Sequence, residues 1–267
     1  MESRVTLKPY IKFPHATAKP IALTARQVGT AYNYPLGVAT GKGFTAGIIE
    51  LGGGYKLNQV LAYFTRYDLP NPKFVSKPVA GGSNTSDGED GADGEVQLDM
   101  IVYGSIATGS TANVYFAPNT DAGFEAAIAQ ALADKCNGIT ISWGQAENAW
   151  AKASITKMEA LFSQARKAGV PVFVAAGDSG STDSTGANVT DYPASSPNVI
   201  GCGGTRLLVN NDSWTRISEV TWDDDRFRRR WLSAWQNISA AITQPAGNWK
   251  CFGSSAMAIA TSKLPTS

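Results

Sequence analysis

The sequence predicts an α/β fold, a doubly wound parallel sheet whose C-terminal part is incomplete. Short apolar segments alternate with longer segments of helical spacing, and glycine-rich turns separate them. Strands that alternate with helices form parallel sheets, because each helix carries the chain back across one face of the sheet. Such sheets collect functional groups at the carboxyl ends of their strands, so a site is expected at that edge.

The predicted elements follow one another in a repeated order. The side-chain oxygen of Thr24 can cap a helix that continues to Tyr32. Residues 45–51 predict a strand, the glycines 52–54 a turn, and apolar residues at helical spacing a helix over 57–64. The same order recurs further on, at residues 113–116 with 122–134, at 138–142 with 151–168, and in a last buried strand at 171–176. A loop rich in Gly, Asp and Ser, residues 83–94, leads into a helix over 95–104.

The composition describes a folded globule and excludes several classes of protein. Hydrophobic residues make up 43% of the 267 residues and charged residues 17%, which argues against an intrinsically disordered chain. The formal net charge of +1 gives no electrostatic reason to expect nucleic acid or an acidic membrane as a partner. No apolar segment reaches the roughly 18 residues of a membrane helix, and residues 1–12 lack the apolar stretch of a signal peptide.

The chain divides into three predicted parts. Residues 1–23 form an N-terminal arm, and residues 24–225 hold the alternating strands and helices. The pattern breaks after Asp225, because residues 226–267 contain six basic residues, no acidic residue and only two glycines. Strands and helices cannot be followed through this basic tail, so the sheet is expected to be incomplete there.

Glu95 and Asp99 are the first candidates for chemistry. They stand four residues apart on a predicted helix, so both side chains project from the same face. Two neighbouring carboxyl groups can share a proton, which raises the apparent pKa of one of them and lets the pair act as a base. A solvated acidic face is the alternative interpretation, but the apolar residues around the pair favour at least partial burial.

Asp178 is the third candidate. It follows the predicted strand 171–176, where a parallel sheet presents its site. A protonated Asp178 can donate a hydrogen bond to a developing oxyanion, and the alternative is a turn aspartate that caps backbone amides. Ser179 as a nucleophile would need a histidine base, but the single histidine, His15, lies in the N-terminal arm. If acyl transfer occurs here, a carboxylate must be the base, and it works best in acid.

Several motifs follow one another in a fixed order between Thr24 and Asp225. They include Ile48-Ile49-Glu50-Leu51-Gly52-Gly53-Gly54-Tyr55, Asp93-Gly94-Glu95-Val96-Gln97-Leu98-Asp99, Val114-Tyr115-Phe116-Ala117-Pro118-Asn119-Thr120-Asp121, Ser142-Trp143-Gly144 and Ala176-Gly177-Asp178-Ser179-Gly180-Ser181. Together these motifs resemble the sedolisin family of serine-carboxyl peptidases. The resemblance implies a subtilisin-like fold and acid endopeptidase activity on unfolded proteins or peptides.

The resemblance also implies a role for five residues. Glu95 is expected to be the general base, Asp99 the carboxylate that orients it, and Asp178 the oxyanion-hole acid. Glu50 and Trp143 match positions that extend the proton network beyond the pair. In the alternative interpretation, Glu50 is a satisfied carboxylate at a strand end and Trp143 is a core aromatic residue.

The sequence also departs from the family pattern. The nucleophilic serine of the family lies in a Gly-Thr-Ser segment that is missing here, and Ser255 in Gly253-Ser254-Ser255 is a faint echo of it. Calcium is the cofactor that the family implies, but its site has no counterpart in this sequence, and the single histidine excludes zinc–histidine clusters. The family also implies secretion. We hypothesise a catalytic domain cut short by a frameshift near Asp225.

Two functions are compatible with this pattern. The first is a serine-type endopeptidase of the sedolisin class, whose nucleophile is Ser255 or is absent from the chain. The second is an inactive truncated remnant or a module that binds peptides without cleaving them. Cleavage of an unfolded substrate at about pH 3 to 5, lost in Glu95→Gln, distinguishes the first from the second.

Overall fold

The structure is a computed structural model that describes residues 8–9, 23–88, 90–180, 185, 188–210, 212–221 and 249–250. Helices and strands alternate through most of this part of the chain. Their order is β1 (Lys8–Pro9), α1 (Ala25–Ala31), β2 (Thr45–Glu50), α2 (Leu57–Arg66), β3 (Lys73–Pro78), α3 (Asp93–Ile106), β4 (Thr111–Phe116), α4 (Asp121–Ala133), β5 (Gly138–Ile141), β6 (Trp143–Ala146), a short 3-10 helix (Glu147–Ala149), α5 (Lys152–Lys167), β7 (Val172–Ala175), β8 (Asp191–Tyr192), β9 (Ile200–Cys202), β10 (Thr205–Val209), β11 (Arg216–Thr221) and β12 (Trp249–Lys250).

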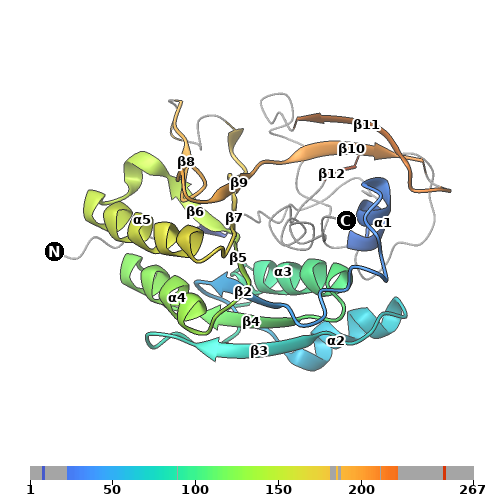
Figure 1. Ribbon diagram of the computed structural model, residues 1–267, viewed down its shortest axis with the longest axis horizontal. Coiled ribbons are helices and arrows are strands. Elements are labelled where there is room, and N and C mark those ends of the chain that lie inside the picture. Colours follow the sequence, from blue (N-terminus) through green and yellow to red (C-terminus); the bar gives the residue numbers. More distant parts are fainter. Residues whose placement is uncertain are drawn as a thin grey trace.

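A six-stranded sheet forms the centre of the described structure. Its strand order is β3-β4-β2-β5-β7-β9, and every neighbouring pair is parallel. Two three-stranded antiparallel sheets accompany it, β1-β6-β8 and β11-β10-β12, and the second extends away from the central sheet in Figure 1. The predicted α/β parallel sheet is therefore confirmed.

Helices cover both faces of the central sheet, so the doubly wound arrangement is also confirmed. Ile48 and Ile49 are neighbours on β2 but belong to different core clusters, because successive residues of a strand point to opposite faces. Ile49 belongs to the cluster that contains Phe124 of α4 and Phe162 of α5. Ile48 belongs to the cluster that contains Phe64 of α2 and the apolar residues of α3.

Most predicted elements lie where the sequence patterns indicate. Thr24 caps α1 as expected: its side-chain oxygen accepts a hydrogen bond from the backbone N–H of Gln27, and the Gln27 side chain accepts one from the Thr24 N–H. Helix α3 begins at Asp93, two residues before the predicted start. Strand β3 was not predicted, because this edge strand is only partly buried and contains two lysines and a proline.

The predicted break in the chain cannot be compared with the structure. Asp225 lies outside the described residues. Within the tail 226–267, the structure describes only β12. Most of the predicted arm 1–23 also lies outside them. Nearly all described residues therefore belong to the predicted central part, residues 24–225.

Strand connections bring distant parts of the chain to one edge of the sheet. Strand β2 lies between β4 and β5, so the chain builds one half of the sheet before crossing to the other. Parallel sheets of this kind bind ligands outside the carboxyl ends of the strands where the order reverses. Glu50 ends β2, Ser142 follows β5, and Asp178 follows β7.

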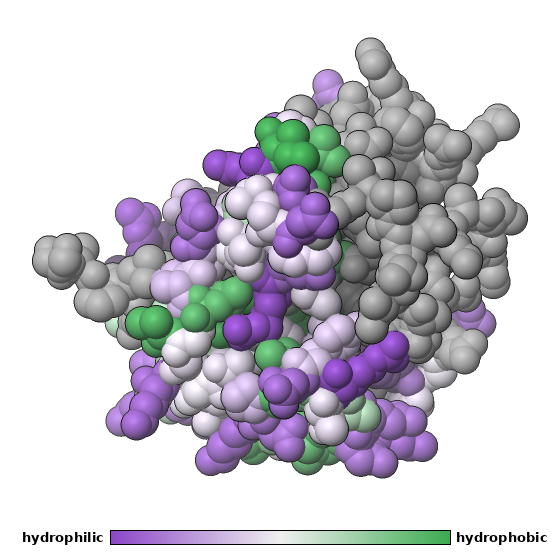
Figure 2. Space-filling model, turned by 90° about the vertical axis from the view of Figure 1, so that its right-hand side faces the viewer, coloured by the Kyte–Doolittle hydropathy of each residue, from purple (hydrophilic) through white to green (hydrophobic). Residues whose placement is uncertain are grey.

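The described surface offers no broad apolar area on the face shown in Figure 2. Hydrophilic and neutral side chains cover most of that described surface, and the hydrophobic patches between them are small. Exposed large hydrophobic residues of the chain include Val38 and Ile217, which lie far apart in sequence. No helix among the described residues is long and apolar enough to cross a membrane.

Candidate active site

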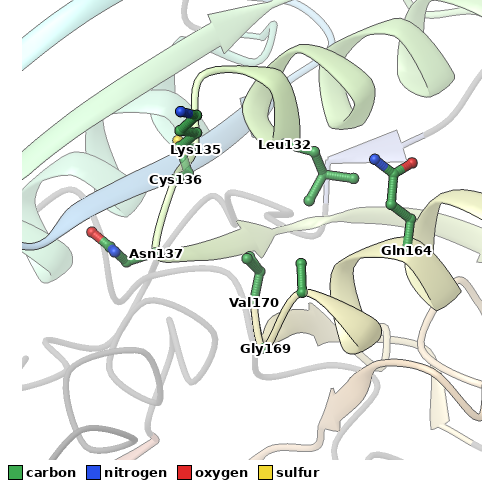
Figure 3. A pocket seen from close by; sticks show the side chains of 8 residues that line it. Leu132, Lys135, Cys136, Asn137, Gln164, Gly169 and Val170 are labelled. Atoms are coloured by element: carbon green, nitrogen blue, oxygen red, sulfur yellow. The ribbon is translucent and has the colours of Figure 1, made fainter.

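A cavity of about 330 Å³ lies at the amino edge of the sheet, away from the predicted site. The α4–β5 and α5–β7 connections form it, and both precede their strands (Figure 3). Its lining residues are Leu132, Lys135, Cys136, Asn137, Gln164, Ala168, Gly169 and Val170. Since none of them is a carboxylic acid and one is a lysine, this cavity lacks the acid–base groups expected of the site.

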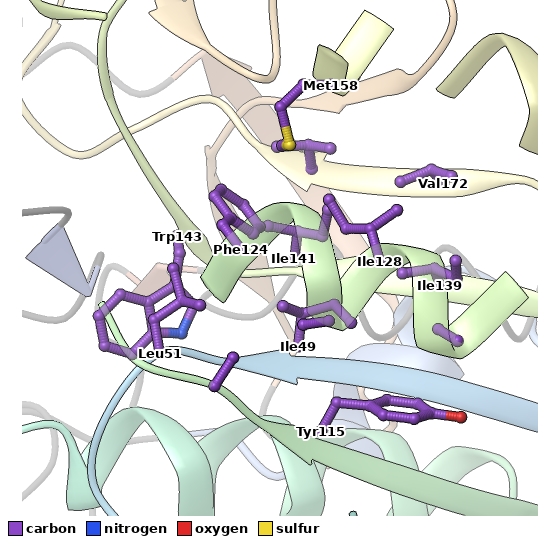
Figure 4. Packing of buried hydrophobic residues seen from close by; sticks show 14 of the residues in the cluster. Ile49, Leu51, Tyr115, Phe124, Ile128, Ile139, Ile141, Trp143, Met158 and Val172 are labelled. Atoms are coloured by element: carbon purple, nitrogen blue, oxygen red, sulfur yellow. The ribbon is translucent and has the colours of Figure 1, made fainter. Parts of the chain in front are cut away.

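The carboxyl edge of the sheet carries a buried pair formed by Glu50 and Trp143. The indole Nε1–H of Trp143 donates a hydrogen bond to Oε2 of Glu50 at 3.0 Å. The Trp143 ring packs in the core cluster beside Leu51, at the end of β2 (Figure 4). Glu50 is completely buried, so a carboxyl group stands at the end of a central strand without contact with solvent.

Glu95 and Asp99 approach the same edge from helix α3. The helix begins at the carboxyl edge because it returns the chain to the start of the next parallel strand, β4. Their side chains are 3% and 0% exposed, so the predicted burial of this acidic pair is confirmed. A hydrogen bond joins the two carboxyl groups. Glu95 lies in the first turn of α3, near the positive end of the helix dipole, and Asp99 lies one turn further on.

Ser142 connects this acidic pair to the sheet. Its Oγ lies 3.0 Å from Oδ1 and 2.8 Å from Oδ2 of Asp99, and it donates to that carboxylate. The Ser142 hydroxyl also acts to lower the pKa of Glu95. Ser142 was not predicted as a site residue. Its position directly after a buried parallel strand was the signal that could have identified it.

Burial raises the pKa values of the three carboxyl groups. Burial and the nearby Asp99, Glu50 and Asp178 hold the pKa of Glu95 well above its ordinary value, although a hydrogen bond with Ser142 opposes the shift. Burial raises the pKa of Asp99 to about 7, against hydrogen bonds with Ser142 and Glu95. Burial and Asp99 also hold the pKa of Glu50 well above its ordinary value, against the hydrogen bond from Trp143.

Asp178 completes the group from a third direction. It follows β7 and is half-buried. Its charge is one of the causes that raise the pKa of Glu95, so the two carboxyl groups lie close enough to interact. The structure therefore brings Glu50, Glu95, Asp99, Trp143 and Asp178 together at one edge, whereas Ser255 lies outside the described residues.

Two buried carboxyl oxygens in this group face no partner. They are Oε2 of Glu95 and Oε1 of Glu50, which have no hydrogen bond to any described residue. A buried oxygen without a partner is costly, so such an atom marks a position where a reacting group or a water molecule can bind. Chemically, the pair can accept a proton at Oε2 of Glu95.

A tightly held loop positions the start of α3. The carboxylate of Asp93 accepts hydrogen bonds from the backbone N–H of Gly54 at 2.7 Å and of Asp87 at 3.1 Å. Gly53 adopts φ +67°, and a Cβ there would lie 2.6 Å from the carbonyl carbon of Ala92. The glycine turn after β2 therefore packs directly against the residues that precede Glu95.

Comparison with known proteins identifies the family of this chain. The chain is 45% identical to kumamolisin of Bacillus sp. (strain MN-32) over 214 residues, which cover 78% of this chain and 38% of kumamolisin. It is 27% identical to sedolisin of Pseudomonas sp. (strain 101) over 198 residues, covering 67% of this chain and 33% of that protein. This chain belongs to the sedolisin family. No general family model matches the sequence.

A solved structure of the sedolisin family supports the assignment. It is that of Pseudomonas sedolisin, a serine-carboxyl proteinase complexed with two molecules of pseudo-iodotyrostatin. The TM-score is 0.67 at 25% sequence identity, over 78% of this chain and 59% of that structure. The chain spans between 26% and 38% of the length of the curated relatives that it matches. The predicted family and its fold are confirmed.

The described residues offer no site for calcium, the cofactor that the sedolisin family implies. Within the described part of the chain, no three or more His, Cys, Asp or Glu side chains are grouped so that they could hold a metal ion. The buried carboxyl groups of the candidate site hydrogen-bond to each other, to Ser142 and to Trp143. We therefore derive no step of the chemistry through a metal ion.

Proposed function

We propose that this chain is the catalytic part of a sedolisin-type endopeptidase that hydrolyses unfolded proteins and peptides in acid, outside the cell. The observation that carries the proposal is the convergence of Glu95, Asp99 and Asp178 at the carboxyl edge of the sheet. Glu95 is the general base and Asp99 the carboxylate that orients it. Glu50 and Trp143 extend the hydrogen-bonded network behind the pair.

The proposed chemistry is acyl transfer with a carboxylate in place of histidine. A serine hydroxyl attacks the peptide carbonyl and gives its proton to Oε2 of Glu95, the buried oxygen without a partner among the described residues. The proton then passes to the leaving amine, and the acyl group stays on the serine. In the second half of the reaction, water attacks the acyl carbonyl and gives its proton to Glu95. The proton then passes to the serine oxygen, and the carboxylic acid product is released. In its protonated form, Asp178 donates a hydrogen bond to the oxyanion of each tetrahedral intermediate.

The proposal assigns the nucleophile to Ser255 if the chain is active by itself. Ser255 lies outside the described residues, so the assignment comes from the faint Gly-Ser-Ser match in the sequence. Ser255→Ala then abolishes cleavage and leaves binding of the substrate intact. Cleavage that survives in Ser255→Ala would remove this serine from the mechanism.

Proteolysis in acid tests the function itself. Purified chain is incubated with an unfolded protein between about pH 3 and 5, and peptide products are measured by mass spectrometry. Glu95→Gln is expected to abolish the products. Glu125→Gln is the matched control. Glu125 lies on α4, not on α3, and forms an ion pair with Lys157 of α5. Loss of cleavage in both variants, or in neither, would contradict the role of Glu95.

A peptide-binding module without catalysis is a second candidate, and one contact favours it. Strand β1 pairs in antiparallel fashion with β6, with Lys8 opposite Gly144 and Pro9 opposite Trp143. This edge of β6, next to the carboxyl groups, thus accepts an extended segment as an added strand. Binding of an unfolded peptide without cleavage at any pH between about 3 and 8 would favour this candidate.

A further inference from the structure

The carboxylate of Glu219 on β11 accepts hydrogen bonds from three elements of the structure. The hydroxyl of Tyr32, the residue that caps the end of α1, donates to its Oε1. The Oγ1 of Thr205, the first residue of β10, donates to the same oxygen at 2.8 Å, and Nη1 of Arg216 donates to Oε2 at 2.9 Å. The Arg216 guanidinium also lies 5.6 Å from the centre of the Tyr32 ring. Glu219 therefore ties the β10–β11 hairpin to α1, from which it is separated by 187 residues of sequence.

The apolar contact between the hairpin and α1 is small. Helix α1 lies below the hairpin in Figure 1, and the two share a cluster of buried side chains that is separate from both large cores of the central sheet. Its buried members are Val28, Ala31, Leu207 and Val209, and Leu23 and Trp214 pack against it. The stabilisation from apolar burial grows with the area that is buried, so a cluster of this size contributes little beside the main cores. The polar contacts of Glu219 therefore matter for holding the hairpin in place.

The connection between β9 and β10 has the properties of a hinge. Strand β9 is fixed in the central sheet, where the carbonyl of its last residue, Cys202, accepts a hydrogen bond from the N–H of Ala176 at 2.9 Å. Gly203 and Gly204 follow and lead directly into β10. A Cβ at Gly203 would have no neighbour within 4 Å. Two successive glycines give the backbone freedom to rotate, so the hairpin can move while β9 stays in place.

We propose that Glu219 is an acid-sensitive latch: its carboxylate holds the β10–β11 hairpin on α1, and its protonation releases the hairpin about Gly203 and Gly204. As an anion, the carboxyl group accepts all three hydrogen bonds, and bonds to a charged group are about twice as strong as neutral ones. Once protonated, it has a hydrogen to donate and loses its ion pair with Arg216. An exposed ion pair contributes little by itself, so the latch depends chiefly on the bonds from Tyr32 and Thr205.

The groups that face Glu219 set the pH at which the latch opens. They are the phenol of Tyr32 from α1, the hydroxyl of Thr205 from β10 and the guanidinium of Arg216 from β11. Burial acts to raise the pKa of Glu219, but the hydrogen bonds from these groups and the charge of Arg216 outweigh it and lower the pKa below its ordinary value of 4.5. A lowered folded-state pKa contributes stability that is present above the ordinary value and is lost as pH falls through the folded-state value. The latch is therefore closed at neutral pH and opens at a pH below 4.5.

The fluorescence of Trp214 tests the latch in the whole chain without any need for peptidase activity. The indole packs against the cluster shared by the hairpin and α1, so release exposes it to water and shifts its emission to longer wavelength. Spectra of Trp214→Phe are subtracted to separate this signal from that of the other tryptophans. As pH falls from about 6 to about 3, the difference spectrum is expected to shift to longer wavelength with a midpoint below 4.5. No shift over this range would overturn the proposal.

Glu219→Gln removes the charge and nearly keeps the shape of the side chain. This variant is expected to lose the transition and to show the emission of the released hairpin already at about pH 6. Asp212→Asn is the matched control, because Asp212 is an exposed acidic residue of the same hairpin, two residues before Trp214. It is expected to keep the transition and its midpoint. A transition that persists in Glu219→Gln, or that is also lost in Asp212→Asn, would contradict the role of Glu219.

Tyr32→Phe covers a failure of Glu219→Gln to fold. It keeps the aromatic ring and the carboxylate but removes one of the three donors, so the midpoint is expected to rise by about 0.5 to 1 pH unit. Tyr34→Phe is its control, because the hydroxyl of Tyr34 donates to the carbonyl of Ala39 at 2.9 Å. An unchanged midpoint in Tyr32→Phe, or an equal rise in Tyr34→Phe, would show that the bond to Glu219 does not close the latch.

Discussion

The indole N–H of Trp143 donates to Oε2 of Glu50 at 3.0 Å, in a place where both side chains are buried. This bond joins the first residue of β6 to the last residue of β2. It opposes the effects of burial and of Asp99, which together raise the pKa of Glu50. The second oxygen of Glu50 has no partner among the described residues. The bond from Trp143 is thus the principal polar contact that stabilises Glu50.

Trp143→Phe is predicted to lower the free energy of unfolding by more than the smaller ring alone would do. Phenylalanine keeps an aromatic ring in the core but has no N–H, so Glu50 loses its donor. A buried hydrogen bond to an ionisable group contributes about 1 to 3 kcal/mol. Urea unfolding measures the change in the free energy of unfolding.

Trp150→Phe is the control for Trp143→Phe. The Nε1 of Trp150 is buried without a partner among the described residues, so the same substitution removes no hydrogen bond there. Trp143→Phe should therefore cost about 1 to 3 kcal/mol more than Trp150→Phe. Equal losses would mean that the bond to Glu50 contributes nothing.

The acidic site is predicted to make the protein less stable at neutral pH than in acid. Burial raises the folded-state pKa of Asp99 from 3.8 to about 7, and those of Glu95 and Glu50 also rise. At a pH between the unfolded-state and the folded-state pKa of such a group, the folded state binds more protons than the unfolded state. The free energy of unfolding therefore falls as pH rises. The stabilisation is complete below about pH 4 and is lost as pH rises through about 7.

Urea unfolding at pH 4 and pH 8 measures this dependence. The free energy of unfolding is expected to be lower at pH 8 than at pH 4, because the folded state keeps the proton of Asp99 up to about pH 7. Asp99→Asn is expected to flatten the dependence, because the amide does not titrate. A chain that is equally stable at both pH values would contradict the raised pKa values.

The residues around Glu95 and Asp99 show what could be predicted from the sequence. The spacing of four residues placed both side chains on one helix face, and the apolar neighbours indicated burial. Their meeting with Ser142 could not be predicted from local spacing, because 43 residues separate Ser142 from Asp99. Such contacts depend on the order of strands in the sheet, which helical and strand periodicity do not specify.

The edge strand β3 shows a second limit. Its sequence Lys-Phe-Val-Ser-Lys-Pro has one buried residue, Phe74, so it lacks the continuous apolar pattern of a central parallel strand. β5 has four buried residues in succession and was predicted. Burial on both faces gives central strands a sequence pattern that edge strands lack.

Asp93→Asn is predicted to loosen the loop that precedes α3. Burial acts to raise the pKa of Asp93, but hydrogen bonds from Ser86 and from the backbone of Asp87 and Gly54 outweigh it and lower the pKa. The depressed pKa contributes stability that is present above the unfolded-state value of 3.8 and is lost as pH falls further. The variant should lose about 1 kcal/mol at pH 7 and less at pH 2.

Asp90→Asn is the control for Asp93→Asn. Asp90 is an exposed residue of the same loop, and its substitution is expected to change the free energy of unfolding by less than about 0.5 kcal/mol. Urea unfolding at both pH values measures each variant. A loss in Asp93→Asn that is as large at pH 2 as at pH 7 would contradict a role for the ionised carboxylate.

Gly53→Ala is predicted to displace the start of α3 and with it Glu95. The substitution introduces backbone strain, because Gly53 adopts φ +67°. It also introduces a steric clash, because a Cβ would lie 2.6 Å from the backbone of Ala92. Gly37→Ala is the control that separates backbone strain from the steric clash. Gly37 has φ +83°, but a Cβ there has no neighbour within 4 Å. Backbone strain alone costs about 1 kcal/mol. Urea unfolding should therefore show a loss near that value in Gly37→Ala and at least about 2 kcal/mol in Gly53→Ala. Equal losses would show that the loop moves aside freely, and Glu95 would then not depend on the glycine turn.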